Sequence, residues 1–200
     1  VTTTETSMAY ENNDEAFSNW YTSLDIQALK EIWGENAVTH SMNDVQEDQT
    51  LTGTKGNDII AGTSEDDALS GDKGNDTLYG LAGDDTLYGG KDKDKLYGDK
   101  GEDTLYGEKG KDLLKGGDGD DILYGGKDKD KLYGKDDDDI LIGGLGTDKY
   151  YGGKGDDIFV VSTGDGYDKL KDFKDGQDKI DISALDSFTL ETSGDDVKLF

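Results

Sequence analysis

A nine-residue repeat dominates the middle of this chain and limits what it can fold into. From Gly53 to Val160 the sequence divides into twelve consecutive blocks of nine with no insertion, and three columns hold throughout. The first position is glycine: Gly53, Gly62, Gly71, Gly80, Gly89, Gly98, Gly107, Gly116, Gly125, Gly134, Gly143 and Gly152. The sixth is aspartate: Asp58, Asp67, Asp76, Asp85, Asp94, Asp103, Asp112, Asp121, Asp130, Asp139, Asp148 and Asp157. The eighth is large and apolar, from Ile60 to Phe159, which indicates stacked structural repeats.

The overall charge of the chain is strongly negative. Lys and Arg number 21 against 47 Asp and Glu, a formal net charge of −26, and hydrophobic residues make up only 32%. Such a balance argues against nucleic acid and anionic membrane surfaces as partners. It is typical of disordered acidic segments unless cations complete the structure, and the strict repeat favours the second reading.

Two classes of structure are excluded by what the composition lacks. No apolar run approaches the roughly 20 residues that a membrane-spanning helix needs, so we expect no transmembrane segment. Cysteine is absent, which excludes disulfides and zinc–thiolate sites.

Each column of the repeat has a physical reason. Glycine allows positive φ angles and brings backbone carbonyls close to an ion. The aspartate carboxylate is a hard oxygen ligand suited to Ca²⁺, which takes 6–8 oxygens in tolerant geometry. The segment around the eighth position is a short strand that points one side chain inward and its neighbours outward. The alternative is that the aspartates are ordinary solvated turn residues, but the presence of twelve aspartates in the same register favours a metal site.

The blocks resemble the RTX (haemolysin-type) nonapeptide, G-G-x-G-x-D-x-U-x. The resemblance implies an all-β fold, a parallel β-roll in which two nonapeptides make one 18-residue turn, with about six turns over residues 53–160. An internal duplication supports the larger unit, since GGKDKDKLYG occurs at Gly89–Gly98 and again at Gly125–Gly134.

The same resemblance implies where calcium binds. Each ion lies between equivalent loops of adjacent turns, held by the sixth-position aspartates and by carbonyls of the glycine-rich positions, with about ten Ca²⁺ in all. The candidate glycines are Gly53, Gly56, Gly71, Gly74, Gly80, Gly83, Gly89, Gly98, Gly101, Gly107, Gly110, Gly116, Gly119, Gly125, Gly134, Gly143, Gly146, Gly152 and Gly155. At the fourth position Glu65, Asp92, Asp128 and Asp137 replace glycine, which either adds a carboxylate or hinders the turn.

Metal binding and folding are expected to be one event. Each block contributes a single inward apolar side chain, so the core is thin, and the stacked carboxylates repel one another without a cation. About ten Ca²⁺ would move the net charge from −26 to about −6.

The C-terminal residues 161–200 are predicted to be a β-rich cap. Gly166 to Ser183 resembles the D-x-I-x-D-F-x-x-G-x-D-x-I-D-L-S segment that caps RTX rolls in serralysin-type secreted proteases, and its apolar alternation favours antiparallel strands. Asp168, Asp172 and Asp178 are candidate extra ligands, with ordinary exposed carboxylates as the alternative. The resemblance implies the type I secretion machinery as a partner and a secreted, extracellular location, with residues 195–200 as a candidate signal.

The N-terminal residues 1–50 lack the repeat. Thr22 to Gly34 predicts an amphipathic helix near 23–33, which resembles the helix that closes the serralysin catalytic domain, and Ser7–Tyr10 faintly resembles a metzincin Met-turn. The zinc motif H-E-x-x-H is missing and His40 is the sole histidine, so the chain as it stands is not expected to be an enzyme. It is either a calcium-driven folding module or the C-terminal part of a secreted zinc metalloprotease, with an attached catalytic domain.

The outward positions leave a third hypothesis open, an extracellular adhesin or polymer-binding module. Tyrosines recur at the ninth position, where they either stack as a ladder or bind sugars and polymers. Odd-numbered and even-numbered blocks are expected to form opposite sheets, and the even sheet becomes apolar toward its end, around Ile140 and Ile158. That end is either covered by the C-terminal segment or another domain, or it reflects only the β-propensity of tyrosine and isoleucine.

Overall fold

The computed structural model describes residues 38–40, 48–162, 166–174, 176–184, 190–193 and 196–199. The predicted helix near 23–33 and the segment resembling a Met-turn lie outside these residues. Every regular element in the described part is a strand, and no helix there is long and apolar enough to cross a membrane.

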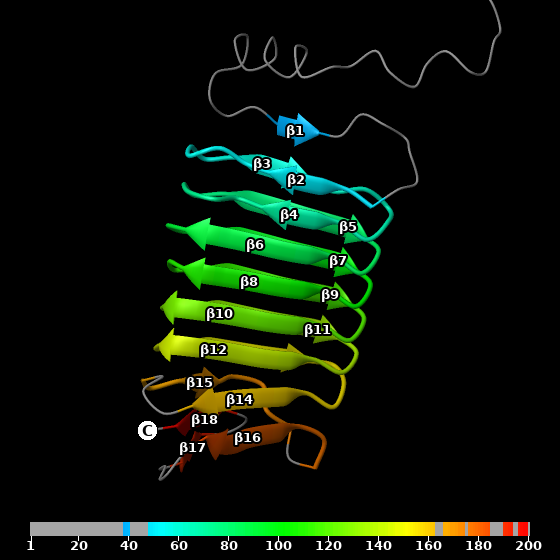
Figure 1. Ribbon diagram of the computed structural model, residues 1–200. Coiled ribbons are helices and arrows are strands. Elements are labelled where there is room, and N and C mark those ends of the chain that lie inside the picture. Colours follow the sequence, from blue (N-terminus) through cyan, green and yellow to red (C-terminus); the bar gives the residue numbers. More distant parts are fainter. Residues whose placement is uncertain are drawn as a thin grey trace, which may run out of the picture.

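The strands form two sheets that stack turn upon turn into a flattened roll (Figure 1). The sheet that we call the odd sheet contains, in spatial order, β1 (Val38–His40), β3 (Ile59–Ala61), β5 (Thr77–Ala82), β7 (Lys95–Lys100), β9 (Leu113–Asp118), β11 (Lys131–Asp136), β13 (Lys149–Gly153), β15 (Lys169–Leu170), β18 (Asp196–Leu199) and β17 (Leu190–Ser193). The even sheet contains β2 (Thr50–Thr52), β4 (Ala68–Ser70), β6 (Thr86–Lys91), β8 (Thr104–Lys109), β10 (Ile122–Asp128), β12 (Ile140–Gly146), β14 (Ile158–Ser162) and β16 (Lys179–Ala184).

The pairing register confirms the predicted parallel β-roll. Leu87 pairs with Leu105 and Leu105 with Leu123, so neighbouring strands of one sheet are 18 residues apart. Odd-numbered and even-numbered repeats supply opposite sheets, as expected. Strands β1 and β2 before the repeats, and β15 and β16 after them, extend the roll beyond the six turns that the twelve repeats build.

The core is one column of eighth-position side chains from each sheet. Alternation along each short strand turns one side chain inward and its two neighbours outward. The side chains with no exposed surface in this column are Ile60, Leu69, Leu78, Leu87, Leu96, Leu105, Leu114, Leu123, Leu132, Leu141, Tyr150 and Phe159. With one such residue per repeat, at up to about 3 kcal/mol each, apolar burial is small for a chain of this length.

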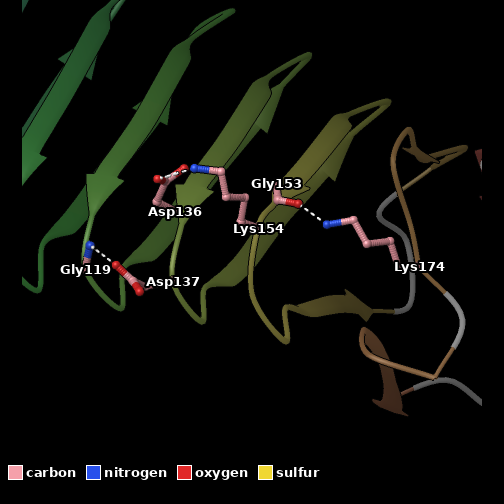
Figure 2. Close-up of polar contacts among 6 residues, drawn as sticks. All are labelled: Gly119, Asp136, Asp137, Gly153, Lys154 and Lys174. Carbon is pink, nitrogen blue, oxygen red and sulfur yellow. Dashed lines mark hydrogen bonds and ion pairs between the residues drawn. The ribbon is translucent and has the colours of Figure 1, made fainter.

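The C-terminal segment continues the roll before it reverses. Strand β15 pairs in parallel with β13, and β16 with β14, so the prediction of antiparallel strands was wrong for these two. The segment resumes the inward apolar column, since Leu170 pairs with Tyr150 and is fully buried. In the described part of this segment, β18 pairs antiparallel with both β15 and β17. The Lys174 ammonium group also donates to the Gly153 carbonyl and ties the segment to the last repeat (Figure 2).

The outward tyrosines form ladders. The rings of Tyr88, Tyr106 and Tyr124 stack with centroids 4.9 and 4.7 Å apart and planes within 5°. Tyr79 and Tyr97 stack in the same way on the odd sheet, at 4.9 Å. A sugar ring stacks on an open aromatic face, and within a ladder each such face lies against the next ring. The ladder interpretation is therefore favoured over polymer binding on the ring faces.

The apolar end of the even sheet is not more covered than the odd sheet. Ile140 and Tyr97 are both half-buried. The β-propensity of isoleucine is sufficient to explain the apolar residues at this end.

Candidate metal centre

Two rows of loops line opposite edges of the roll. Strands of the two sheets point in opposite directions, so the loops that follow even strands gather on one edge and those that follow odd strands on the other (Figure 1). Each loop lies within the first six positions of a nonapeptide, and many of the preceding strands extend into the first three of them. Every candidate aspartate of the sixth column therefore lies directly before a strand, at the end of its loop.

The sixth-position aspartates form a hydrogen-bonded ladder along each edge. The backbone N–H of each aspartate donates to Oδ1 of the aspartate one turn further on. The bond from Asp94 to Asp112 and that from Asp112 to Asp130 are both 2.8 Å long. The other edge repeats the pattern, with Asp85 donating to Asp103 and Asp103 to Asp121 at 2.8 Å. All twelve aspartates are buried, at most 3% exposed, so they are not solvated turn residues.

The predicted extra ligands of the C-terminal segment differ in position. Asp168 extends one ladder, because its Oδ1 accepts from the Asp148 N–H at 2.8 Å. Asp178 extends the other, accepting from the Asp157 N–H at 3.3 Å. Both are buried, whereas Asp172 is half-buried and accepts instead from the Gly152 N–H at 2.9 Å.

The first-position glycines lie beneath the ladder carboxylates. A Cβ added to Gly53 would lie 2.8 Å from Asp58 Oδ2 and 2.8 Å from the Gly71 carbonyl oxygen of the next turn. At most other first-position glycines, an added Cβ would likewise lie close to a ladder carboxylate and a carbonyl oxygen of the next turn. At Gly98, Gly116 and Gly152 the three nearest atoms all belong to the ladder aspartate, and at Gly143 they include the Tyr150 hydroxyl. Only glycine fits at the first position, because any side chain would collide with these oxygens. Without a side chain there, the carboxylate and carbonyl oxygens can lie next to each other.

Most fourth-position residues, with the exception of Gly56, Glu65 and Gly146, hold their loops in a left-handed turn. Gly74 and Gly101 have φ of 113° and 119°. Asp92, Asp128 and Asp137 keep this conformation with φ of 80°, 84° and 76°, so an aspartate here does not prevent the turn. Asp is among the residues that tolerate this region.

One oxygen of most ladder carboxylates is buried without a hydrogen-bond partner. This holds for Oδ2 of Asp76, Asp85, Asp94, Asp103, Asp112, Asp121, Asp130, Asp139 and Asp157. A buried carboxylate oxygen with no donor is costly unless a cation compensates it. Within the described ranges no three His, Cys, Asp or Glu side chains group as for a metal ion. Unpartnered carboxylate oxygens beside backbone carbonyls form an all-oxygen donor set of the kind that Ca²⁺ prefers.

The ladder resists ionisation when no cation is present. Burial raises the pKa of Asp112 to about 8 and of Asp139 to about 9, from 3.8. The same cause raises the pKa of Asp85, Asp94, Asp121 and Asp130 to about 7, and of Asp76, Asp103 and Asp157 to about 6. Backbone N–H donors oppose the rise, and neighbouring carboxylates add to it, as Asp130, Asp94 and Asp128 do at Asp112.

Acid is therefore expected to favour the metal-free roll. A carboxyl group whose pKa is raised on folding stabilises the fold below its unfolded pKa near 3.8, and this contribution is lost as pH rises through the folded value. For Asp76 the loss is complete above about pH 6, and for Asp112 above about pH 8. In chelator, circular dichroism should show more β-structure at about pH 4 than at about pH 8. A chelated chain with equal or greater β-content at pH 8 would contradict this.

Two threonines bind ladder carboxylates in a way that sequence reasoning missed. The Thr54 hydroxyl donates to Asp58 Oδ2 at 3.0 Å, and the Thr63 hydroxyl donates to Asp67 Oδ2 at 3.1 Å. Their backbone N–H groups donate to the same oxygens at 2.5 Å. The second position of the loop looked undemanding because it varies, yet a hydroxyl there supplies the donor that later repeats lack. Threonine at this position in only the first two repeats was the available signal.

Comparison with known families agrees with this geometry. The model of the RTX calcium-binding nonapeptide repeat matches residues 46–78, 61–96, 70–105, 97–132 and 124–159, which together cover more than half of the chain. The chain matches none of the curated proteins with which it was compared. Its twelve nonapeptides, parallel roll and buried aspartate ladders place this chain in the family of RTX calcium-binding nonapeptide repeat proteins.

Proposed function

We propose that this chain is a folding module driven by calcium, which orders only when ions neutralise the two aspartate ladders. The observation that carries the proposal is the row of buried Oδ2 atoms without hydrogen-bond partners. Their carboxyl groups have pKa values raised by burial, so at neutral pH the metal-free roll must either bind protons or unfold. RTX repeats bind calcium, and a bound divalent cation would neutralise the buried carboxylates, so that the roll could stay folded at neutral pH.

The ligands in this proposal are the ladder aspartates and the carbonyls of the loop glycines. An ion between adjacent loops would use carboxylates from two turns, which gives about five sites along each edge and about ten in the roll. Asp168 and Asp178 continue the ladders, and each would supply a carboxylate for one further site at the end of its row. Asp172 lies beside Gly152, off the ladder, and we do not assign it a ligand role.

Secretion of the chain would rely on the same dependence of folding on calcium. At cytosolic calcium concentrations the chain would remain unfolded and suited to a type I secretion channel. Outside the cell, where calcium-binding modules have Kd values of about 10⁻⁴–10⁻³ M, it would fold and be retained in the extracellular space. The absence of cysteine supports this route, since folding then needs no disulfide chemistry.

A calcium titration followed by far-ultraviolet circular dichroism tests the proposal, with magnesium as the control. We expect a cooperative transition from coil to β-structure near millimolar Ca²⁺ and none with Mg²⁺, because Mg²⁺ demands near-octahedral geometry and dehydrates reluctantly. A chain that is fully folded in chelator at neutral pH, or that stays disordered at high calcium, would refute it.

An attached catalytic domain is a second proposal, and the observation that favours it is the sequence from Thr22 to Gly34. In serralysin-like metalloproteases a similar helix precedes the roll. The zinc motif H-E-x-x-H-x-x-G-x-x-H in the same open reading frame, ahead of Val1, would support a protease as the parent protein. Its absence from that reading frame would remove this candidate.

A further inference from the structure

The two rows of loops carry opposite exposed charge. We call the loops 53–58, 71–76, 89–94, 107–112, 125–130 and 143–148 the lysine edge, and the loops 62–67, 80–85, 98–103, 116–121, 134–139 and 152–157 the acidic edge. Apart from the buried ladder aspartates, the lysine edge has eight lysines and four acidic residues, and the acidic edge has eleven acidic residues and three lysines. The eight lysines are Lys55, Lys73, Lys91, Lys93, Lys109, Lys111, Lys127 and Lys129.

The lysines of this edge stand in register and lack ion pairs. Lys91 pairs with Lys109, and Lys109 with Lys127, as direct neighbours on adjacent turns, and all three are exposed. Like charges in such positions repel one another, so binding of an external anion would reduce the repulsion between these lysines. A salt bridge joins Lys154 to Asp136 at 2.6 Å, and it lies on the acidic edge (Figure 2).

The acidic edge presents a column of carboxylates with the same spacing. The fifth position of its loops is acidic in every turn: Asp66, Asp84, Glu102, Asp120, Asp138 and Asp156. Backbone donors hold these side chains in line, since the Glu102 N–H donates to Asp84 Oδ1 at 2.8 Å and the Asp138 N–H donates to Asp120 Oδ1 at 2.9 Å. One oxygen of Asp66, Asp84, Asp120 and Asp138 thus caps the next turn, which fixes where these negative charges lie.

From these two columns we propose that calcium-loaded rolls associate side by side, with the lysine edge of one copy against the acidic edge of a second copy. Both columns belong to the same roll and repeat once per turn, about 4.8 Å, so lysines and carboxylates match over the five turns that carry a third-position lysine. The occupant is a second copy because the complementary charge, at the matching spacing, is present in the chain itself.

Calcium controls this association, which therefore rests on the proposed function. Counting the six ladder aspartates of each row, the metal-free lysine edge carries a charge of about −2 and the acidic edge about −14. About five ions per row change these values to about +8 and about −4. The edges thus attract one another only in the loaded state. Since the contact joins two different surfaces, it is heterologous and does not close at two copies.

Two sets of substitutions test the contact, each with its fold checked by circular dichroism in calcium. The triple variant K91Q/K109Q/K127Q removes the charge of three adjacent lysines in the middle of the lysine edge. The triple variant D84N/D120N/D138N removes three of the six carboxylate charges of the acidic column and keeps a side-chain oxygen that caps the next turn, as Asn57 does for the Asn75 N–H at 2.7 Å. The control K95Q/K131Q/K149Q removes the same charge from the first residues of odd-sheet strands, outside the loops of both edges.

Sedimentation equilibrium in millimolar calcium measures the association. At about 0.1 M salt we expect the unmodified chain and the control to form a concentration-dependent series of oligomers. This series should weaken at about 1 M salt, where the Debye length falls from roughly 10 Å to roughly 3 Å. Each edge variant alone should associate roughly tenfold more weakly, the loss of about three exposed ion pairs. An equimolar mixture of the two edge variants should form a 1:1 dimer. The intact acidic edge of the lysine variant contacts the intact lysine edge of the carboxylate variant, and the two weakened edges that remain do not extend it.

Several results would overturn this inference. A chain that folds with calcium yet remains monomeric at low salt refutes the contact and leaves the proposed function intact. Association that persists in either edge variant, or that is lost equally in the odd-sheet control, places the contact elsewhere. Capture of an added sulfated polysaccharide by the lysine edge of a monomeric chain would identify a different occupant. A chain that fails to fold with calcium at all instead refutes the proposed function.

Discussion

Substituting Gly107 by alanine is expected to disrupt the middle of the roll even in saturating calcium. The added Cβ would lie 2.5 Å from the Gly125 carbonyl oxygen and 2.8 Å from Asp112 Oδ2, closer than real Cβ contacts come. One of these atoms is backbone of the next turn and the other belongs to the ladder, so relief requires either separating two turns or displacing a candidate ligand. We expect a loss of about 3 kcal/mol or more in the free energy of unfolding, at the upper end of overpacking effects.

Chemical denaturation in calcium, followed by circular dichroism, measures this loss. Gly176→Ala is the control, because nothing lies within 4 Å of a Cβ added there and only its φ of 90° opposes alanine. The control should cost about 1–2 kcal/mol. If Gly107→Ala were no more destabilising than Gly176→Ala, the close stacking of first-position glycines on the ladder would be wrong.

The substitution Asp112→Asn is expected to change stability in opposite directions with and without calcium. Burial and the neighbouring Asp130 and Asp94 raise the Asp112 pKa to about 8, so the charged form is costly in the metal-free roll. An asparagine keeps the oxygen that accepts from the Asp94 N–H, removes the charge, and offers an amide group close to the Gly125 carbonyl. In chelator at neutral pH the variant should therefore gain β-structure.

In calcium the same variant should lose affinity, because an amide is a weaker calcium ligand than a carboxylate. We expect the midpoint of the calcium titration to rise and one or two of about ten ions to be lost, since Asp112 borders two loops of its row. Isothermal titration calorimetry and circular dichroism measure both effects. The matched control is Asp66→Asn, an exposed residue whose Oδ1 accepts from the Asp84 N–H at 2.7 Å. An equal shift in the control would show that total charge, and not the buried ladder, sets calcium dependence.

The nine-residue repeat, together with its resemblance to the RTX nonapeptide, was sufficient to predict the architecture. A strict nine-residue spacing of an inward apolar side chain is compatible with a two-sheet roll of 18 residues per turn, and Leu105 pairs with Leu87 and Leu123 as that period requires. The aspartates could likewise be assigned to loops, because they fall two residues before each buried core position. Periodicity fixes these features because it acts on every turn in the same way.

The C-terminal continuation could not be predicted from this period. Asp168 follows Asp148 by 20 residues and Asp178 follows Asp157 by 21, so both leave the 18-residue register. The structure nevertheless brings them onto the ladders, because the chain absorbs the extra residues in its loops while β15 and β16 keep parallel pairing. Loop length carries no periodic signal, and only the packing of Leu170 against the roll fixes where the strand resumes.

The sequence by itself determined the repeat, the two sheets, the inward apolar column and the positions of the acidic residues. Only the tertiary structure decided where the acidic side chains point and which groups they bind. The ladder aspartates turn inward, so that Oδ1 of Asp112 caps the turn before it and its Oδ2 is buried without a donor. The Thr54 hydroxyl supplies such a donor for Asp58. The direction of a side chain depends on what the neighbouring turn offers, and that neighbour is 18 residues away in sequence.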